Sequence, residues 1–289
     1  MAGLAIDIGA TKMAAGIVDE SGTLFDHAQT PTIHGQGAEA LYEGLLAMVR
    51  ELLESSGAAV SWCGVGCAGP MERNGERISP INIPTWQSFA LRQRLRDDLG
   101  IEVAIDIDTK ALALGEGWCG AARGVDNFMA MVVSSGIGGG IVVDGHILDG
   151  RSGNAGHIGH IVAVPGGRRC VCGVRGCLEA EVSGIAILAK TGRPAEEADT
   201  GFRQEVGRLV GASVAQAVTL LDLDLVLIAG SVALGYGDDF FGPAQEALEE
   251  NLGMTYTKGA KIRPAGLGAT GPLIGAAGIA RARGLFGPQ

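Results

Sequence analysis

The sequence predicts an α/β protein built from two lobes. With 289 residues, of which 47% are apolar and 19% charged, the chain is long enough for two compact domains and too apolar to stay disordered. Short apolar runs alternate with segments of helical periodicity along the whole chain. The pattern of strand, glycine turn and strand occurs twice, as AIDIGATKMAAGIV at 5–18 and MVVSSGIGGGIVV at 131–143, which indicates a duplicated domain.

The first half of the chain is expected to alternate strands and helices. In chain order, we expect strands at 4–8, 13–18, 24–29, 62–66 and 102–108, and helices at 38–56, 88–99 and 109–119. Several of these strands are short apolar runs, whereas the first helix has apolar side chains at every third or fourth residue. Gly57 and Gly100 follow two of the helices as C-terminal stops. Ser88 is expected to begin the second helix, and Asp108 or Thr109 to cap the third.

The second half opens in the same way. In chain order, we expect a strand at 128–133, a glycine loop at 134–140, a strand at 141–143, a loop over 150–177, helices near 178–190 and 203–221, a strand at 224–229, and helices at 239–251 and 272–284. The strand at 224–229 is almost continuously apolar, as expected of a strand covered on both faces. We therefore place one lobe at 1–110, joined by the C-terminal helix at 272–289, and the other at 111–271.

Composition and charge exclude several classes of protein. The formal net charge of −10 argues against a nucleic-acid partner, since affinity for a phosphate backbone comes largely from Lys and Arg. No run approaches the roughly 18 uncharged apolar residues that span a bilayer. The first residues also lack the basic region and long apolar stretch of a signal peptide. We therefore expect a cytoplasmic protein that binds neither nucleic acid nor membranes.

The turn after the first strand is a candidate phosphate site. Asp7 ends the strand, where a carboxylate can hold hydrated Mg²⁺. Gly9 and Thr11 offer backbone N–H groups and a hydroxyl to phosphate oxygens, and Lys12 adds a positive charge. The alternative is an ordinary hairpin in which Asp7 only helps to form the turn.

The glycine loop at 134–140 is a second candidate. Its glycines would let the backbone approach a phosphate closely, and the residues concerned are Ser135, Gly136, Gly138 and Gly139. The loop lacks the Gly-Lys-Ser/Thr of a P-loop, and no helix follows it, so a Rossmann fingerprint is also disfavoured. An ordinary turn is the alternative. Two such turns, one from each lobe, would clamp one polyphosphate between them.

A further glycine turn, at Gly230, follows the apolar strand at 224–229. The carboxyl end of a strand is a usual nucleotide position in α/β folds. The alternative is an ordinary connection to the next helix.

Two carboxylates lie at the end of the strand at 102–108. Strand alternation should place Asp106 and Asp108 on one face and the neighbouring isoleucines on the other. A carboxylate here can take the proton from a substrate hydroxyl during phosphoryl transfer. The alternative for Asp108 is that it only caps the helix that follows.

Three cysteines form the most specific pattern. Cys170, Cys172 and Cys177 lie within eight residues, close to the histidines of His157-Ile-Gly-His160. With one histidine they supply a tetrahedral Cys₃His zinc set, which leaves no open position and therefore indicates a structural rather than a catalytic ion. The other three cysteines lie in apolar, glycine-containing contexts typical of small buried residues: Cys63, Cys67 and Cys119.

Taken in order, these motifs resemble the ROK family (repressors, open reading frames and sugar kinases) over essentially the whole chain. CVCGVRGCLE at 170–179 matches the family pattern C-x-C-G-x-x-G-C-x-E without a gap, and DIGATK and SSGIGGG look like its two phosphate motifs. The resemblance implies two ribonuclease-H-like lobes of the actin/hexokinase-like ATPase fold, closing on a sugar and ATP.

The resemblance also implies roles for individual residues. Asp108 would be the catalytic base. The zinc ligands would be His160, Cys170, Cys172 and Cys177, and the sugar would meet His157, His160, Glu179 and, in a looser alignment, Asn82. The implied cofactors are ATP, Mg²⁺ and structural zinc, and the implied assembly is a homodimer or homotetramer.

The chain departs from the family pattern at four positions: Ala10 for glycine, Ile107 for the Asn before the catalytic Asp, Lys110 for a common Asn, and His157 for the Glu of E-x-G-H. Ile107 offers no hydrogen bond, and an imidazole offers one nitrogen where a carboxylate offers two oxygens. We therefore expect weak or altered hexose selectivity, with Asp106 replacing part of the lost contact.

The expected function is ATP-dependent phosphorylation of a hexose, with glucose to glucose 6-phosphate as the default that the family implies. One alternative is a non-catalytic sugar-binding regulator on the same fold. The repressors of the family carry an N-terminal helix-turn-helix, whereas Asp7 here already belongs to the first phosphate motif. A kinase of a non-hexose polyol or cyclitol is the other alternative.

Overall fold

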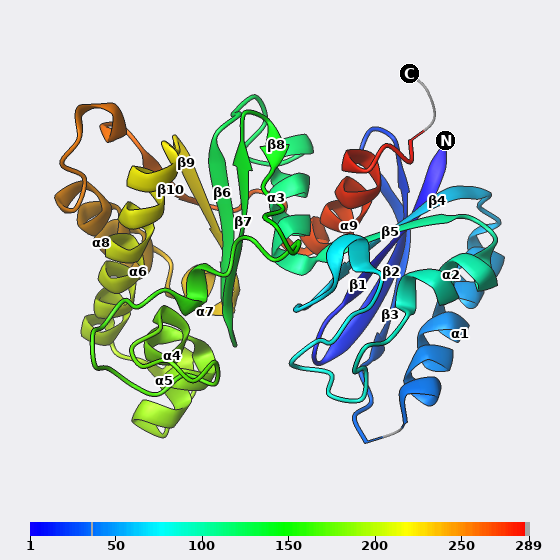
Figure 1. The fold of residues 1–289 in the computed structure, drawn as a ribbon, viewed down its shortest axis with the longest axis horizontal. Coiled ribbons are helices and arrows are strands. Elements are labelled where there is room, and N and C mark those ends of the chain that lie inside the picture. The colour runs from blue at the N-terminus through cyan, green and yellow to red at the C-terminus, as the bar shows by residue number, and fades with distance from the viewer. Residues whose placement is uncertain (36, 287–289) are drawn as a thin grey trace. The chain divides into compact units, whose positions relative to one another are not determined.

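The computed structural model describes residues 1–35 and 37–286. It divides into two compact units (Figure 1). The first unit contains Met1–Arg123, Asp149–Ala155 and the chain from Leu267 onward, and the second contains Gly124–Leu148 and Gly156–Gly266. The first unit thus runs beyond the expected boundary at residue 110.

The first unit has a five-stranded sheet in the order β3-β2-β1-β4-β5. Its strands are β1 (Ala2–Ile8), β2 (Lys12–Asp19), β3 (Leu24–Pro31), β4 (Val60–Cys67) and β5 (Glu102–Ile107). Its helices are α1 (Ala38–Ser56), α2 (Leu91–Leu99), α3 (Asp108–Trp118) and α9 (Gly271–Ala282). One apolar core lies between the sheet and α1 and α2, and a second lies between the sheet and α9, so both faces of the sheet are covered.

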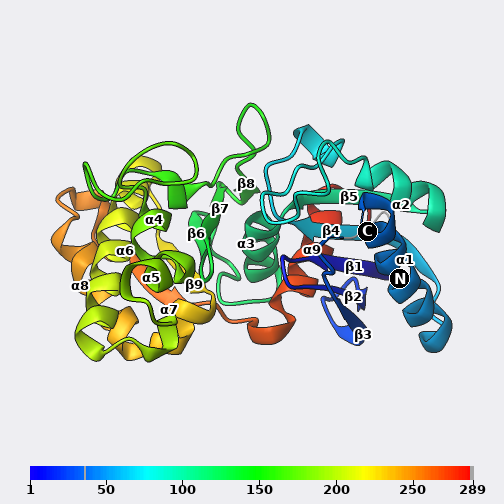
Figure 2. The ribbon, with the colours of Figure 1, turned by 90° about the horizontal axis from the view of Figure 1, so that it is seen from below.

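Helices α3 and α9 explain why the first unit extends past residue 110. They lie side by side in both views (Figures 1 and 2). A Cβ added at Gly275 would lie 2.5 Å from the carbonyl oxygen of Ala111, so only glycine allows this approach. Because α9 also packs on β1 and β4, it ties α3 to the first sheet.

The second unit repeats the topology of the first. Its strands are β6 (Phe128–Val133), β7 (Ile137–Val143), β8 (His146–Ile147), β9 (Leu225–Ala229) and β10 (Lys261–Pro264), in the order β10-β9-β6-β7-β8. Numbered by their order within the unit, the strands of both sheets run 3-2-1-4-5. In both units the first two strands form an antiparallel hairpin and the first and fourth pair in parallel. The duplication predicted from the two glycine turns is therefore confirmed.

The helices of the second unit are α4 (Leu178–Val182), α5 (Gly184–Thr191), α6 (Thr200–Leu221), α7 (Ser231–Tyr236) and α8 (Asp238–Glu250). Short 3-10 turns lie at Arg73–Gly75, Ile158–His160, Ala195–Glu197, Thr255–Thr257 and Gly268–Thr270. Helices α6 and α8 pack closely at Gly207 and Gly211. A Cβ at either glycine would lie within 2.4 Å of a backbone oxygen of α8, so a larger residue would force the helices apart. Over the residues that the structure describes, no helix combines the length and apolarity that a membrane span requires.

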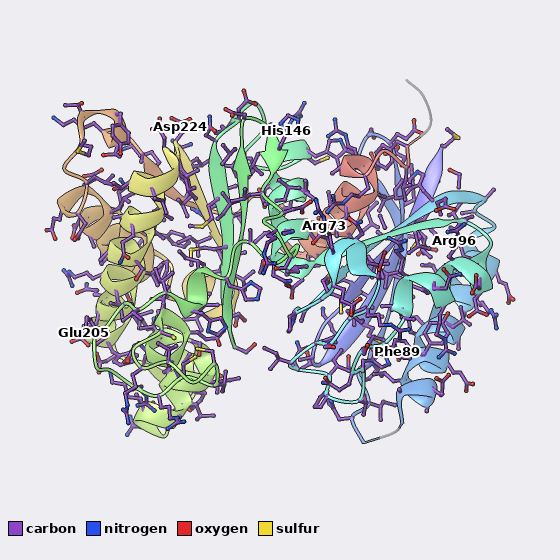
Figure 3. All side chains as sticks on the ribbon, viewed as in Figure 1. Arg73, Phe89, Arg96, His146, Glu205 and Asp224 are labelled. Atoms are coloured by element: carbon purple, nitrogen blue, oxygen red, sulfur yellow. The ribbon has the colours of Figure 1, made fainter. Side chains whose placement is uncertain are left out.

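Most predicted elements are present, and two helix stops are confirmed. Gly57 and Gly100 end α1 and α2 with φ of 61° and 68°, in the left-handed region that favours glycine. The expected start of α2 at Ser88 is wrong, because α2 begins at Leu91. Ser88 instead donates its backbone N–H to the Ser79 hydroxyl, and the next residue, Phe89 (labelled in Figure 3), pairs with Ile78.

The glycine loop expected at 134–140 is shorter than predicted. Gly138, Gly139 and Gly140 belong to β7, where they face Val132, Met131 and Ala130 of β6. The turn between the strands is left with Ser134, Ser135 and Gly136. Strand pairing uses backbone N–H and C=O groups, which glycine has like any other residue. A run of glycines can therefore form a strand rather than a loop. Strands β8 and β10 and helix α7 are present although no pattern in the sequence predicted them.

Candidate active site

Two carboxylates come together at one end of the first sheet. Gly66 of β4 pairs with Asp7 of β1 on one side and with Asp106 of β5 on the other. A Cβ added at Gly66 would lie 3.8 Å from Oδ1 of Asp7 and 3.7 Å from the Cα of Asp108. The bare backbone of Gly66 therefore separates the first residue of α3 from the end of β1, and Asp7 and Asp108 face a shared space.

The surroundings of these carboxylates change their protonation. Burial raises the pKa of Asp108, although its Oδ1 accepts a hydrogen bond from the N–H of Thr109 at 2.7 Å, which opposes the rise. Burial and the nearby charge of Asp108 raise the pKa of Asp7 to about 7, and Lys12 opposes this shift. A raised pKa makes Asp108 a better proton acceptor once it is ionised. Asp7 is poised to release a proton when a cation binds beside it.

We expect Asp7→Asn to change how stability depends on pH. In the absence of Mg²⁺, the folded protein holds the Asp7 proton up to about pH 7, whereas the unfolded chain releases it near pH 3.8. Folding stability is therefore lost as pH rises from about 4 through 7. Asp7→Asn, which carries no such charge, should have the higher Tm at pH 8 and the flatter Tm profile between pH 5 and 8, measured in Mg²⁺-free buffer.

The matched control is Asp26→Asn, on the exposed edge strand β3. That variant should keep the wild-type profile. A wild-type profile in Asp7→Asn as well would show that Asp7 is ionised throughout this range.

The turn after β1 is closed by main-chain and side-chain hydrogen bonds. Gly9 N–H donates to the Lys12 carbonyl at 3.0 Å, and the Thr32 hydroxyl donates to the Gly9 carbonyl at 2.8 Å. Thr11 and Lys12 are exposed. The turn is thus rigid, with the hydroxyl and ammonium of these two residues open to a ligand.

Asp106 does not share this position, contrary to the expected alternation. It is 4% exposed, and its carboxylate pairs with Arg283 at 2.7 Å and with Lys110 at 3.3 Å. The alternation fails because Asp108 already begins α3. Ile107 is 3% exposed and belongs to the apolar core beneath α1 and α2, so it contributes to packing. Both carboxylate oxygens of Asp106 are paired with Arg283 and Lys110, so Asp106 is not available to replace a sugar contact.

Asn82 lies in the loop between β4 and α2. Its Oδ1 is buried and has no hydrogen-bond partner among the described residues. Leaving a buried amide oxygen unpaired costs stability, so such an atom is a candidate for binding a ligand donor.

In the second unit, Glu179 is attached to the turn between β6 and β7. Its Oε2 accepts the N–H of Ile137 at 2.8 Å, and a Cβ added at Gly136 would lie 3.0 Å from the same oxygen. Its Oε1 lies 4.0 Å from Nε2 of His160. His157 is exposed, and its ring centroid lies 6.0 Å from that of His160. The structure therefore brings the predicted sugar residues of this unit to one place, beside the turn that contains Ser135 and Gly136.

The turn at Gly230 meets the same place from β9. The hydroxyls of Ser231 and Ser134 lie 3.0 Å apart. Gly230 has a φ of 103°, and a Cβ there would lie 2.4 Å from the Val133 carbonyl oxygen, so only glycine fits. Gly184, the first residue of α5, donates its N–H to the Ser134 carbonyl at 2.7 Å. Ser231 directly follows Gly230 and belongs to the turn predicted after the strand at 224–229, whereas no local pattern in the sequence distinguishes Gly184.

Three cysteines and a histidine form a compact cluster in the second unit. The ligand atoms of His160, Cys170, Cys172 and Cys177 all lie within 4.8 Å of one another. Nδ1 of His160 is 3.5 Å from the Cys170 sulfur, and the sulfurs of Cys172 and Cys177 are also 3.5 Å apart. Sulfurs bound to one tetrahedral zinc at about 2.3 Å would have similar separations of roughly 3.7 Å.

The chemistry of the cluster also fits a cation. Burial, followed by the adjacent thiols, raises the pKa of Cys177 to about 12. The N–H of Val174 lowers the pKa of Cys172. Several thiols this close can all ionise only if a positive ion compensates their charge. The cluster is therefore suited to a metal. The other ring nitrogen of His160, Nε2, points toward Glu179.

Comparisons with known proteins find similarity over nearly the whole chain. A family model described as the ROK family matches residues 3–283. The chain is 29% identical over 312 residues to a glucokinase from Thermotoga maritima, with 97% of each chain covered. It is 34% identical over 252 residues to an N-acetylmannosamine kinase from Yersinia pseudotuberculosis, with 81% of this chain and 84% of the relative covered.

The fold agrees as well. The crystal structure of a ROK family glucokinase from Streptomyces griseus in complex with glucose and AMPPNP is similar, with a TM-score of 0.83, 28% identity, and 97% of this chain and 99% of that chain covered. The two sheets of equal strand order are the ribonuclease-H-like lobes of an actin/hexokinase-like fold. The matched range covers nearly all of the chain, which therefore belongs to the ROK family.

Proposed function

We propose that this protein transfers a phosphoryl group from ATP to a hydroxyl of a sugar, and that the sugar is a hexose. The observation that carries the proposal is the position of Asp108, the first residue of α3. Its Cα and the Asp7 carboxylate both lie next to Gly66, which has no side chain to fill the space between them. A proton acceptor and a candidate Mg²⁺ ligand in one place are what phosphoryl transfer requires. The similarity to glucokinases supports the same reaction.

Asp108 is proposed as the base. Its ionised carboxylate accepts the proton of the sugar hydroxyl while the hydroxyl oxygen attacks the γ-phosphorus of ATP, and the bond to the β–γ bridging oxygen breaks, leaving ADP. Burial raises the pKa of Asp108 and so makes it a stronger acceptor. Asp7 would hold Mg²⁺, which neutralises charge on the phosphates.

Ligand contacts are proposed on both units. The phosphate contacts would be Gly9, Thr11, Lys12, Ser135, Gly136 and Gly230, and the sugar contacts would be Asn82, His157, His160 and Glu179. The Oδ1 of Asn82, which has no partner among the described residues, and the position of Glu179 beside the Ser134–Gly136 turn support this assignment. Gly138 and Gly139, which were also expected to meet phosphate, lie inside β7 and would act through the position of the turn.

A structural zinc is proposed at the cluster of His160, Cys170, Cys172 and Cys177. Four protein ligands complete a tetrahedral zinc, so the ion would hold the 160–177 loop together rather than activate a reactant. With Nδ1 of His160 on the metal side, its Nε2 stays available to a sugar hydroxyl near Glu179. The ion would therefore orient His160.

Glucose is the first substrate to test, and N-acetylmannosamine the second, because a kinase of that sugar is 34% identical to this chain. His157 in place of a carboxylate favours a change in selectivity at that position. A polyol or cyclitol acceptor remains the broader alternative. A cytoplasmic location and a homodimeric or homotetrameric assembly remain predictions.

The proposed function predicts sugar-dependent release of ADP from Mg·ATP. We expect a coupled assay to give turnover of the order of 1–100 s⁻¹, typical of kinases, on at least one of glucose, mannose, N-acetylmannosamine and a set of polyols. The control is the same mixture without acceptor. Sugar binding by calorimetry without ADP release on any acceptor would instead support the non-catalytic regulator.

A further inference from the structure

Four charged side chains of the first unit, of which two are buried, form a group here called the charge cluster: the buried Asp106 and Lys110, and the more exposed Asp149 and Arg283. Lys110 is 0% exposed. Its ammonium contacts the Asp149 carboxylate at 2.7 Å, the Gly153 carbonyl at 2.8 Å and the Asp106 carboxylate at 3.3 Å. Arg283 bridges the same two carboxylates, at 2.7 Å to Asp106 and 3.0 Å to Asp149.

The charge cluster is balanced, with two cations and two anions. An ammonium has three N–H donors, and each of the three acceptors around Lys110 can take one of them. A buried ammonium without partners would be strongly destabilising, so the position of Lys110 depends on these acceptors. The positions of the acceptors depend in turn on the Lys110 ammonium. The charged groups of the cluster therefore stabilise one another.

One partner of Lys110 is a short piece of chain, Asp149–Ala155, here called the crossover segment. It belongs to the first unit, although the residues on both sides of it belong to the second. Lys110 contacts it at both Asp149 and Gly153. Asn154 holds it to the loop after β4, since its side chain exchanges hydrogen bonds with the N–H and carbonyl of Met71 at 3.3 and 3.0 Å.

The next turn of the same loop also borders the crossover segment. A Cβ added at Gly153 would lie 3.5 Å from the Cα of Arg73, which Figure 3 labels at the start of a 3-10 turn. The segment is thus attached to α3 through Lys110 and to the loop after β4 through Asn154.

These attachments lie close to Asp108 along the chain. Lys110 is two residues after Asp108 in the first turn of α3. On the other side, Ile107 packs at Gly69, where an added Cβ would lie 3.4 Å from its Cδ1 and 3.9 Å from Oδ1 of Asn154. The crossover segment is therefore bonded directly to the first turn of α3 through Lys110, and Gly69 lies between Asn154 of the segment and Ile107.

We propose that Lys110 is a positioning residue: through the crossover segment it holds the first turn of α3, and with it the Asp108 carboxylate, in the orientation that accepts the proton of the substrate. The proposal rests on the proposed sugar kinase function, with Asp108 as base. Without the ammonium, Asp106 and Asp149 would share one guanidinium, and Gly153 would lose its donor. The crossover segment would then detach from α3.

The test compares Lys110→Met with Leu45→Ala. Methionine has about the length of lysine but no donor, and Leu45 is a 0% exposed side chain of α1 that is no member of the charge cluster. We expect Lys110→Met to lower kcat by about 10–100-fold, because small displacements of a reacting group have effects of this size. The Michaelis constant for ATP should change little. Leu45→Ala should lower Tm at least as much but leave kcat within about twofold.

Amide hydrogen exchange provides a second readout that does not depend on activity. Exchange in the crossover segment and at Met71 should accelerate at least tenfold in Lys110→Met and stay at the wild-type rate in Leu45→Ala. If both variants show equal kcat and equal exchange in the segment, the charge cluster only stabilises the fold and the proposal is wrong. If wild type phosphorylates no acceptor, the proposed function fails, and unchanged exchange in Lys110→Met would overturn the positioning role separately.

A second variant keeps the proposal testable if Lys110→Met does not fold. Asp149→Asn retains the shape of the side chain and an acceptor for Lys110 but removes one charge. We expect a smaller loss of kcat, of about 3–10-fold, and faster exchange confined to the crossover segment. Wild-type kcat and exchange in this variant would contradict the proposal.

Discussion

Asp108→Asn should lose about 10²–10⁴-fold in kcat, the range over which a positioned general base contributes. The amide keeps the shape of the side chain and can still accept the N–H of Thr109, which Asp108 now accepts at 2.7 Å. The start of α3 should therefore be preserved. Because an amide cannot take up the proton of the hydroxyl, the loss should fall on kcat, while the dissociation constant for sugar, measured by calorimetry, stays within a few-fold.

The matched control for this variant is Asp98→Asn. Asp98 is a carboxylate of the same unit on α2, where it accepts a hydrogen bond from the Tyr42 hydroxyl at 2.6 Å. This control should retain wild-type turnover even if its Tm falls. Turnover of Asp108→Asn within a few-fold of wild type would remove Asp108 from the role of base.

Cys172→Ser should abolish stoichiometric zinc and destabilise the second unit. Elemental analysis of wild-type protein should find about one zinc per chain, and the variant well below that, because the cluster loses one of its four ligands. Metal binding and the folding of the 160–177 loop are coupled, so we expect Tm to fall by more than about 5 °C, which is of the order of 2 kcal/mol for a protein of this size.

Cys119→Ser is the control. Cys119 is a partly exposed cysteine of the first unit whose thiol lies 3.5 Å from the Ser21 carbonyl. It should keep the full zinc content and a Tm within about 2 °C of wild type. Wild-type protein that is folded and active without bound zinc would refute the metal site.

If His160 is oriented by the cluster, loss of zinc should also weaken sugar binding. Its Nε2 lies 4.0 Å from Glu179, and Glu179 is attached to the Ser134–Gly136 turn through Ile137. Damage to the cluster is thus expected to reach the sugar contacts before it reaches Asp108, which belongs to the other unit. The two variants should therefore differ: Asp108→Asn in kcat, Cys172→Ser in sugar affinity and Tm.

Much of the fold was predictable because its signals are local. Helix α1 occupies 38–56, as its apolar periodicity predicted, and it ends at Gly57. The duplication was predictable because each unit begins with the same hairpin, and the equal strand order confirms it. The predicted start of α2 and the predicted extent of the glycine loop were both wrong, because each depends on a contact with a residue in another segment of the chain. Ser88 bonds to Ser79, and Gly138 pairs with Val132, and neither partner can be identified from the local sequence.

The cluster of three cysteines and His160 could likewise be predicted from sequence, since the cysteines lie within eight residues and close proximity follows from the chain itself. Sequence also identified Asp7 and Asp108 separately, each at the end of an apolar strand. Only the tertiary structure placed them on the two sides of Gly66, because strand order joins β1 to β4 and β4 to β5.

Only the tertiary structure shows which residues Asp106 and Lys110 contact. Alternation along β5 suggested that Asp106 would face the substrate, and a departure from the family pattern was all that distinguished Lys110. In the folded chain Asp106 meets Arg283, 177 positions away, and Lys110 meets Asp149, 39 positions away. A buried charge is stable only with a partner, and that partner is brought by the packing of α9 and of the crossover segment, which no local pattern of residues specifies.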